Sequence, residues 1–441
     1  MFSFVQTSSA RKNAIALYCF ALGQVFVMAS DYYVSTNGND PDAGTKASPW
    51  RTIQHAASSL KPGDTTHVLA GTYNEKIRVT SAGTKDGGFI TIQAEGAVIV
   101  SGKDMRGDNI FHIKDKSFVR IIGFEIRDNL KVKDGSGIRV EGACDHVELI
   151  KNRIHEMRGM DAMGITIYGN NSDNPLTNLL IEGNEIYDCD PARSEALTLN
   201  GNVSGFKILN NTVRDVNNIG ICMIGGEKWI AKDRSKVTRN GLCKGNKVMR
   251  ARSSYGDGYA AGIYVDGGSD IVIEDNDVTG CDLGIEVGAE NKGMMTSGII
   301  VRGNRMFLNQ KAGMVFGGFE KKAGRVTECV FEKNICYHND QHKDKNGELW
   351  IQLATKCKVI GNTFWSSGDG PVLQVVKEAS DNVLDKNIYF SESGKDKTEF
   401  NWRGHEVSGF AAYLKTSGQD AASCFKQPAF RAPGKGDFTE P

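Results

Sequence analysis

Short stretches of alternating apolar and polar residues follow one another along most of the chain, and each ends in Gly, Asn, Asp or Lys. From Thr65 onward they have the length and the two-residue period of β-strands that bury one face. In the first part of the chain they read HVLAGTY, KIRVTSAG, FITIQAE, AVIVSG, NIFHI and FVRIIGFEIRD. This pattern predicts an all-β protein made of many short strands.

An asparagine recurs at the end of an apolar strand at intervals of 25 to 35 residues. A period of this length is typical of a solenoid, in which each coil repeats the last. Asparagine suits the bend of a coil because it tolerates the left-handed conformation, and stacked amides can bond to one another as a ladder. Leucine-rich and propeller repeats are disfavoured because their leucine pattern and Trp-Asp signature are missing. The nine positions are Asn152, Asn184, Asn211, Asn246, Asn276, Asn304, Asn334, Asn362 and Asn387.

Glycine marks a second turn of each coil, directly before another strand. The ends of the chain depart from the repeat. Residues 51–60 have apolar residues at helical spacing, with Ser48 as the expected N-cap, and predict a short helix that covers the first coil. Residues 391–441 are expected to form a C-terminal cap with a short helix near 409–417. The second-turn glycines are Gly137, Gly164, Gly220, Gly262, Gly284 and Gly313.

The first 29 residues predict a signal peptide. Arg11 and Lys12 precede the apolar run AIALYCFALGQVFVMA, whose last residues offer a cleavage site. The alternative is a retained membrane anchor, for which the run is short. We therefore expect a signal peptide (1–29), a β-helix with an N-terminal cap (30–390) and a C-terminal cap (391–441), in a secreted or periplasmic protein.

Charge and cysteine content narrow the possible partners. The 53 basic and 53 acidic residues cancel, so no global field favours nucleic acid or an anionic membrane. We expect neither as a partner after signal cleavage, and we expect a monomer. Ten cysteines, of which Cys19 lies in the predicted signal, form no C-x-x-C pair. This argues against a zinc site or a dense disulfide framework and favours small buried side chains.

The opening YYVSTNGNDPDAGTKASPWRTIQHAASSLKPGDTTHVLAGTYNEKI, with the G-I-x-V and N-x-V repeats after it, resembles the right-handed parallel β-helix proteins of the pectate-lyase-like superfamily. The resemblance is greatest to secreted bacterial members with an N-terminal domain of unknown function, and it covers nearly all of the chain after the signal. It implies a right-handed parallel β-helix. It leaves the reaction open, because that superfamily holds polysaccharide lyases, glycoside hydrolases, epimerases and non-catalytic adhesins or tailspikes.

Function must therefore be sought on the outward face. In each G-I-x-V strand the two aliphatic residues point inward, so the positions between and after them point outward. Aromatic, amide and acidic groups gather near the middle of this wall, which suits a sugar chain. The outward pairs are Arg139 and Glu141, Thr166 and Tyr168, Thr198 and Asn200, Cys222 and Ile224, Tyr264 and Asp266, Glu286 and Gly288, Val315 and Gly317, and Trp350 and Gln352.

Asp266 and Glu286 are the candidate catalytic pair. They lie on consecutive strands, offset by one outward position, so their α-carbons should be about 8 Å apart. Side-chain reach then permits either the ~5 Å separation of a retaining glycosidase or the ~6.5–9.5 Å of an inverting one. A pair of like charges should raise the pKa of one member, as a general acid requires. The alternative is that both are solvated carboxylates on the strand face.

A long insertion between Asn211 and Asn246, with a second loop ending near Asp257, is expected to emerge beside the same face. The turn after Glu286 adds further polar groups. We predict that these segments and the outward wall bind the substrate. The candidate binding residues are Tyr264, Glu290, Lys292, Glu227, Trp229, Asn200, Tyr168 and Asp257.

Two further functions stay open beside hydrolysis of a polysaccharide, for which no cofactor is expected. A polysaccharide lyase would use a Lys or Arg base, here Lys228, Lys292 or Arg234, and would bind calcium through Asp257, Asp266, Glu286 and Glu290. The sequence lacks the paired-aspartate calcium cluster of some lyases and the D-P-H-D string of the alginate epimerases, which favours hydrolysis. A non-catalytic glycan-binding β-helix would leave the insertion unexplained.

Overall fold

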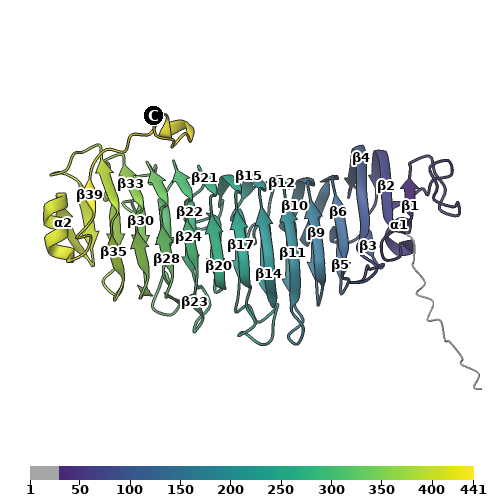
Figure 1. The fold of residues 1–441 in the computed structure, drawn as a ribbon, viewed down its shortest axis with the longest axis horizontal. Coiled ribbons are helices and arrows are strands. Elements are labelled where there is room, and N and C mark those ends of the chain that lie inside the picture. The colour runs from purple at the N-terminus through teal and green to yellow at the C-terminus, as the bar shows by residue number, and fades with distance from the viewer. Residues whose placement is uncertain (1–28) are drawn as a thin grey trace, which may run out of the picture.

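The chain is wound into one long stack of coils in a computed structural model that describes residues 29–441 (Figure 1). Nearly all of the signal peptide predicted for residues 1–29 lies outside the described residues. Strands of successive coils pair in parallel along the whole stack. The all-β solenoid predicted from the repeat is confirmed. Among residues 29–441, no helix has the length and apolar character that crossing a membrane requires.

Three parallel sheets run along the stack. The first contains β3 (Ile77–Val79), β5 (Asn109–Lys114), the ends of β8 (Asn129–Glu141) and β10 (Arg153–Gly169), β13 (Leu197–Gly201), β16 (Ile221–Ile224), β19 (Ala261–Asp266), β22 (Leu283–Gly288), β26 (Ala312–Phe316), β30 (Leu349–Ile351), β34 (Leu373–Val375) and β37 (Glu399–Trp402).

The second sheet contains β1 (Asp31–Val34), β2 (Thr65–Asn74), β4 (Ile90–Ser101), β6 (Val119–Ile122), β9 (Asp145–Ile150), β11 (Leu176–Glu182), β14 (Val203–Leu209), β17 (Arg239–Lys244), β20 (Ser269–Glu274), β24 (Ile300–Arg302), β28 (Val330–Glu332), β32 (Lys358–Ile360) and β35 (Val383–Asp385). Three short strands continue from β20 beside it, namely β23 (Met295–Ser297), β27 (Arg325–Thr327) and β31 (Ala354–Thr355).

The third sheet begins with the ends of β2 and β4. It continues through β7 (Glu125–Arg127), the start of β10, β12 (Glu185–Cys189), β15 (Thr212–Asn217), β18 (Lys247–Arg252), β21 (Asp277–Thr279), β25 (Arg305–Phe307), β29 (Ile335–Tyr337), β33 (Thr363–Ser366), β36 (Ile388–Ser391) and β39 (Cys424–Phe425).

The predicted asparagine ladder is present and buried. In each of the first eight ladder asparagines the side-chain Nδ2 donates to the Oδ1 of the asparagine one coil further on, at 2.8–3.2 Å. The Nδ2 of Asn276 also donates to the carbonyl of Cys243 at 3.0 Å, and its Oδ1 accepts both the backbone N–H and the Nδ2 of Asn246. The ladder thus satisfies amide and backbone groups that would otherwise be buried without partners.

The left-handed conformation expected of the ladder asparagines belongs to the residue before each of them. Asp275, before Asn276, has φ 56°, and Gly303, before Asn304, has φ 65°. The expectation was wrong because the asparagine amide must point inward along the stack. The preceding residue, on the outside of the coil, takes the left-handed conformation and bends the chain.

Two columns of buried amides end in a carboxylate. Asn387 Nδ2 donates at 2.9 Å to Asp420, which also accepts the hydroxyls of Tyr389 and Tyr413. A shorter column runs from Asn309 through Asn339 and ends at Glu348, which accepts the backbone N–H and the Nδ2 of Asn339. Burial raises the pKa of Glu348 to about 8.

The second-turn glycines have a steric role. Gly262 lies inside β19, and a Cβ on it would overlap the side chain of Val278 from the third sheet. Inside the coil the aliphatic residues of the G-I-x-V strands are fully buried, as in Ile263 and Val265. Each such side chain stabilises the fold by about 1.5–3 kcal/mol.

Caps close both ends of the stack (Figure 1). The N-terminal helix is α1 (Ile53–Ser59), and its cap is Thr52, whose hydroxyl accepts the His55 N–H at 3.1 Å. Ser48 was therefore the wrong cap, because the chain enters the helix four residues later. The predicted C-terminal helix is α2 (Phe410–Ser417). Within residues 391–441, β37 still pairs with β34, and β38 (His405–Ser408) pairs antiparallel to β37.

The last residues, including the 3-10 helix η1 (Pro433–Lys435), lie back along the coils (Figure 1). Phe438 packs edge-on against Phe307 and Tyr337, and Phe430 stacks on Trp365. All nine cysteines of the described chain are free, and all except Cys424 are buried, as expected of small core side chains.

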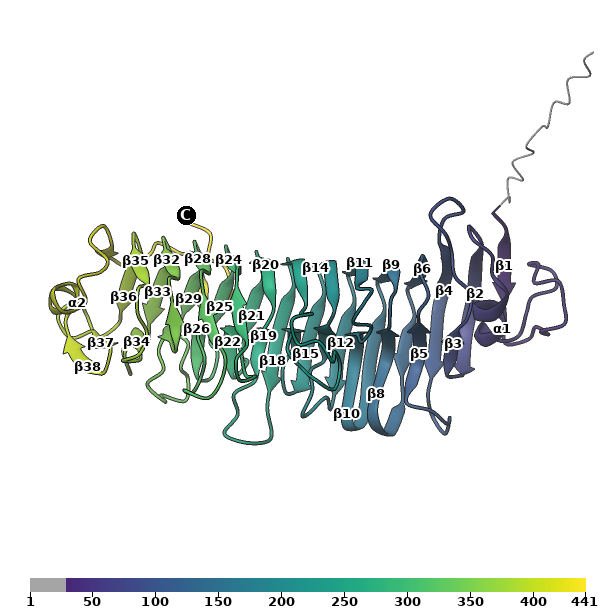
Figure 2. The ribbon, with the colours of Figure 1, turned by 90° about the horizontal axis from the view of Figure 1, so that it is seen from below.

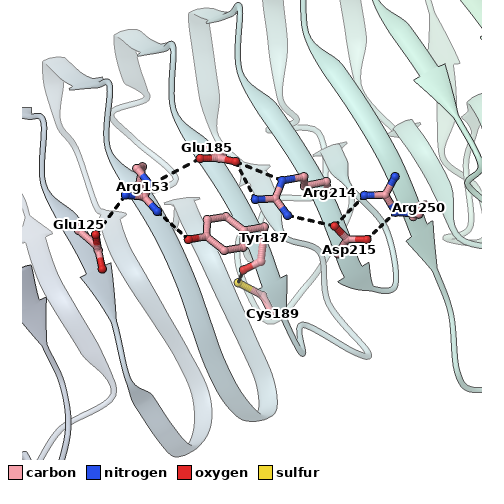
Figure 3. A network of polar contacts seen from close by, with 8 residues as sticks. All are labelled: Glu125, Arg153, Glu185, Tyr187, Cys189, Arg214, Asp215 and Arg250. Atoms are coloured by element: carbon pink, nitrogen blue, oxygen red, sulfur yellow. Dashed lines mark hydrogen bonds and ion pairs between the residues drawn. The ribbon is translucent and has the colours of Figure 1, made fainter. Parts of the chain in front are cut away.

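Ion pairs cross the outside of the third sheet from coil to coil. Glu185 on β12 accepts Arg214 from β15 at 2.8 Å, and Asp215 accepts Arg250 from β18 (Figure 3). The ring of Tyr187 lies between the guanidinium of Arg214 and the stacked ring of His155. These partly exposed ion pairs link neighbouring coils, and each adds about 1 kcal/mol or less to stability.

Candidate active site

The outward face of the first sheet carries the candidate site. Strands β19, β22 and β26 lie side by side in the middle of the stack (Figure 2). Their register pairs Tyr264 with Glu286 and Asp266 with Gly288. The predicted offset of one outward position between Asp266 and Glu286 is therefore confirmed.

Two adjoining cavities open on this face. The first, of about 220 Å³, is called the acidic cavity. The second, of about 430 Å³, is called the neighbouring cavity. Tyr264, Glu290 and Ile219 line both. The acidic cavity is further lined by Tyr168, Arg193, Ser194, Glu195, Asn200, Cys222, Ile224, Glu227, Trp229, Tyr255 and Asp266. The neighbouring cavity is further lined by Tyr259, Leu283, Glu286, Phe319, Trp350 and Gln352.

Most of the predicted site residues come together here. Asp266 lines the acidic cavity and Glu286 the neighbouring one. Tyr264 and Glu290 separate the two, while Tyr168, Asn200, Glu227 and Trp229 line the acidic cavity.

Lys292 and Asp257 are exposed and line neither cavity. The side chain of Lys292 leaves the turn on the solvent side, and only its carbonyl is used, as the acceptor of Arg234. The loop that carries Asp257 instead contributes Tyr255 to the acidic cavity and Tyr259 to the neighbouring one.

The carboxyl group of Asp266 is almost entirely buried, with 5% of the residue exposed. Its Oδ1 accepts the backbone N–H of Glu290 at 2.7 Å. Burial raises the pKa of Asp266 well above its ordinary value, and the charges of Glu290, Glu227 and Glu195 act in the same direction. The hydrogen bond from Glu290 opposes this shift because it favours the ionised form.

Glu286 lies beside Tyr264 and is partly buried. Burial also raises its pKa well above the ordinary value, followed by the charges of Glu290 and Asp266. Nothing in the described chain donates a hydrogen bond to its carboxyl group that would counter this shift. Glu286 therefore holds its proton more firmly than an exposed glutamate does.

Glu290 connects the two cavities. The hydroxyl of Tyr264 donates to its Oε1 at 3.4 Å. That contact needs the glycine at 288, because a Cβ there would meet the Tyr264 ring and hydroxyl. Burial raises the pKa of Glu290, although the bond from Tyr264 lowers it in part.

Glu195 is a member of the acidic cavity that the sequence did not reveal. It lies just before β13, in the segment that joins β12 to β13. Burial, assisted by the charges of Glu290 and Glu227, raises its pKa to about 8. Its position follows from the path of a connecting segment outside the counted repeat. The sequence signal was a lone acid next to an outward-facing strand.

The insertion after β16 folds over the site as predicted. Asn291 Nδ2 donates to Glu227 at 2.8 Å, and Arg234 Nη2 donates to the carbonyl of Lys292 at 3.0 Å. The ring of Trp229 meets Tyr168 edge-on with the centroids 5.5 Å apart. The insertion is thereby fixed to the turn after β22 and forms one wall of the acidic cavity.

The raised pKa of Glu195 predicts a pH effect on stability. The unfolded chain loses this proton near the ordinary pKa of 4.5, whereas the folded chain keeps it to about pH 8. The free energy of unfolding should therefore fall as the pH rises between these values. At about pH 8.5 Glu195→Gln should be more stable than the wild type by up to about 5 kcal/mol, and at about pH 4 or below the two should agree.

Urea unfolding at a series of pH values measures this difference. Glu328→Gln is the matched control, because Glu328 is exposed in the turn between β27 and β28 and lines neither cavity. Parallel pH curves for the wild type and Glu195→Gln would contradict the prediction.

No three His, Cys, Asp or Glu side chains within residues 29–441 are arranged to hold a metal ion.

The chain was compared with known proteins. It matches the Pel9A-like, right handed beta helix region over residues 32–226 and the right handed beta helix region over residues 195–364. The uncharacterized protein YwoF of Bacillus subtilis (strain 168) is 34% identical over 430 residues, which are 93% of this chain and 91% of YwoF. The chain belongs to the right-handed parallel β-helix proteins of the pectate-lyase-like superfamily. The predicted membership of this β-helix superfamily is confirmed, and secretion stays a prediction.

Other members of this fold are more distant. Pectate lyase PEL9 of Emericella nidulans is 28% identical over 166 residues, 34% of this chain and 39% of that protein. The GH136 lacto-N-biosidase of Eubacterium ramulus aligns with a TM-score of 0.59 at 14% identity, over 80% of this chain and 67% of that one. The Family 28 exopolygalacturonase of Yersinia enterocolitica aligns with a TM-score of 0.54 at 13% identity, over 83% and 76%. At these identities the two structures show a shared fold.

Proposed function

We propose that this protein is a carbohydrate-active enzyme that hydrolyses glycosidic bonds, with Asp266 and Glu286 as its carboxyl pair. The observation that carries the proposal is the convergence of four acids on two adjoining cavities of one outward face, next to aromatic rings: Asp266, Glu286, Glu290 and Glu195, all with raised pKa. Glycoside hydrolysis needs two carboxyl groups of unequal proton affinity on either side of the scissile bond.

The hydrogen bonds suggest which carboxyl plays which role. The carboxyl group of Glu286 accepts no hydrogen bond that would favour its ionised form, so Glu286 is the better general acid for the departing oxygen. Asp266 accepts the N–H of Glu290, which favours its ionised form. It therefore acts as the base or the nucleophile on the other side of the bond.

Aromatic side chains support sugar binding beside the acids. Trp229 is 63% exposed and stands at the rim of the acidic cavity, with Tyr168 against its edge. Flat apolar faces next to a few polar groups suit a pyranose ring. The named activities of the relatives, which include a pectate lyase, a lacto-N-biosidase and an exopolygalacturonase, are consistent with a carbohydrate substrate.

A polysaccharide lyase is the second candidate, favoured by the similarity to pectate lyase PEL9 over one third of the chain. The bases considered for it are poorly placed. Lys228 and Lys292 are exposed outside both cavities, and Arg234 donates to two backbone carbonyls. Arg193 is the one basic residue in the described lining of the two cavities. This distribution favours hydrolysis.

The test is incubation with a panel of neutral and uronic polysaccharides. We expect new reducing ends without ultraviolet absorbance from an unsaturated product, and no effect of a chelator. An unsaturated product that disappears with chelator would establish the lyase instead. Binding without cleavage on the full panel would leave a glycan-binding β-helix. Action outside the cytoplasm, as a monomer, remains a prediction from the sequence.

A further inference from the structure

The neighbouring cavity contains polar groups that the proposed acid pair does not use. Gln352 is 6% exposed, and its side-chain Oε1 has no hydrogen-bond partner in the described chain. The indole Nε1 of Trp350, two residues earlier on β30, is also buried without a partner. An unpaired donor and an unpaired acceptor therefore belong to one wall of the same cavity.

Such groups are costly unless a ligand or water satisfies them. A sugar hydroxyl can do both tasks, because it accepts a bond from the indole N–H and donates one to the amide oxygen. The rest of the cavity matches this ligand. Tyr259 and Phe319 present exposed aromatic surface, and the volume of about 430 Å³ is within the range of a small-ligand site.

The titratable residues around the cavity disfavour an acidic sugar. Glu286 and Glu290 line it, and Asp266 lies on the adjacent strand. Lys311 packs its ammonium over the ring of Tyr259 at 4.2 Å and is paired with Asp344 at 3.0 Å, so its charge is already matched. An acidic sugar bound here would bring its carboxylate next to these further acids, and no basic residue lines the described cavity to pair with it.

We propose that the neighbouring cavity is a subsite for an uncharged sugar unit, whose hydroxyls accept a hydrogen bond from the Trp350 indole and donate one to the Gln352 amide oxygen. The proposal rests on the proposed function, because Tyr264 and Glu290 join this cavity to the acidic one and place the sugar beside Glu286. It narrows the substrate to neutral glycans and assigns binding roles to Trp350 on β30 and to Gln352, which directly follows that strand.

The experiment measures binding to the full chain carrying Asp266→Asn, by calorimetry, so that cleavage cannot intervene. The probes are cellotriose, xylotriose and galactotriose, with trigalacturonate as the charged counterpart. We expect at least one neutral trisaccharide to bind more tightly than trigalacturonate. Trp350→Phe and Gln352→Ala, added singly, should each raise its Kd about fivefold.

Trp365→Phe is the matched control, because it also removes an indole N–H, but one that is already bound to Glu392 at 2.8 Å on another sheet. Its Kd should stay within about twofold of the background variant. Circular dichroism confirms that each variant is folded. In the active chain, Trp350→Phe and Gln352→Ala should raise KM and leave kcat nearly unchanged.

Three results would overturn the subsite: no binding of any neutral trisaccharide, preferred binding of trigalacturonate, or unchanged Kd in both folded variants. These outcomes test the subsite and can be distinguished from results that test the proposed hydrolysis. A protein that binds neutral trisaccharides through Trp350 and Gln352 but cleaves none would contradict hydrolysis alone. Cleavage with an unchanged Kd and KM in both variants would contradict the subsite alone.

Discussion

Glu286→Gln should lower kcat for a natural glycan about a thousandfold, because the amide cannot give a proton to the departing oxygen. The loss should be much smaller for an aryl glycoside with an acidic phenol as its leaving group, since that phenolate departs without a proton. Asp266→Asn should lose at least as much activity on both substrates. The contrast between the two substrates separates the acid from the base or nucleophile.

The matched control for both changes is Asp86→Asn, an exposed carboxylate on the N-terminal coils. It should retain the wild-type kcat and KM. If Glu286→Gln lost activity equally on both substrates, Glu286 would not be the general acid. The roles of the pair would then have to be exchanged or withdrawn. Full activity in both site variants would refute the assignment of the pair, and the remaining buried acids, Glu195 first, would then be tested in the same way.

Asn276→Ala should destabilise the protein by about 3–5 kcal/mol, although Asn276 lies far below the outward face. The change removes the acceptor of two donors from Asn246 and the donor to both Asn304 and the carbonyl of Cys243. It also leaves a cavity the size of the lost amide. Each buried group left unpaired costs about 1–3 kcal/mol.

Urea unfolding measures this loss. The control is Asn174→Ala, because Asn174 is exposed in the loop before β11 and has no left-handed backbone conformation to preserve. The control should change stability by about 0.5 kcal/mol or less. An unfolding midpoint for Asn276→Ala close to that of the control would show that the ladder adds little to stability.

The fold could be predicted because its chemistry recurs in every coil. The ladder asparagines, the inward aliphatic residues and the outward offset of Asp266 from Glu286 follow from a fixed strand period. The detail of the bend could not be predicted from residue type. Asp275 and Lys333 take the left-handed conformation next to the asparagines, and the repeat does not reveal which of two neighbours bends.

The candidate site was predictable residue by residue where it lies on strands, and in part where the insertion and the turn after β22 supply Glu227, Trp229 and Glu290. Tyr264, Asp266 and Glu286 were found by counting outward positions. Glu195, by contrast, reaches the acidic cavity from a connecting segment whose path depends on tertiary packing. The same reason explains why Tyr255 and Tyr259 line the cavities while Asp257, between them in sequence, does not. Loop side chains lack the strict alternation that strands impose.

Asp420, which closes the long amide ladder, has a consequence for the evolution of length in this protein. Every bond in the ladder points the same way, with the donor on the N-terminal side. A carboxylate accepts such a bond but has no N–H to offer to a further coil. Duplicating a coil in the middle of the chain would thus keep a donor and an acceptor for every hydrogen bond of the ladder. Adding one beyond Asp420 would first require an amide at that position, so growth by internal duplication is the path that the polarity of the ladder leaves open.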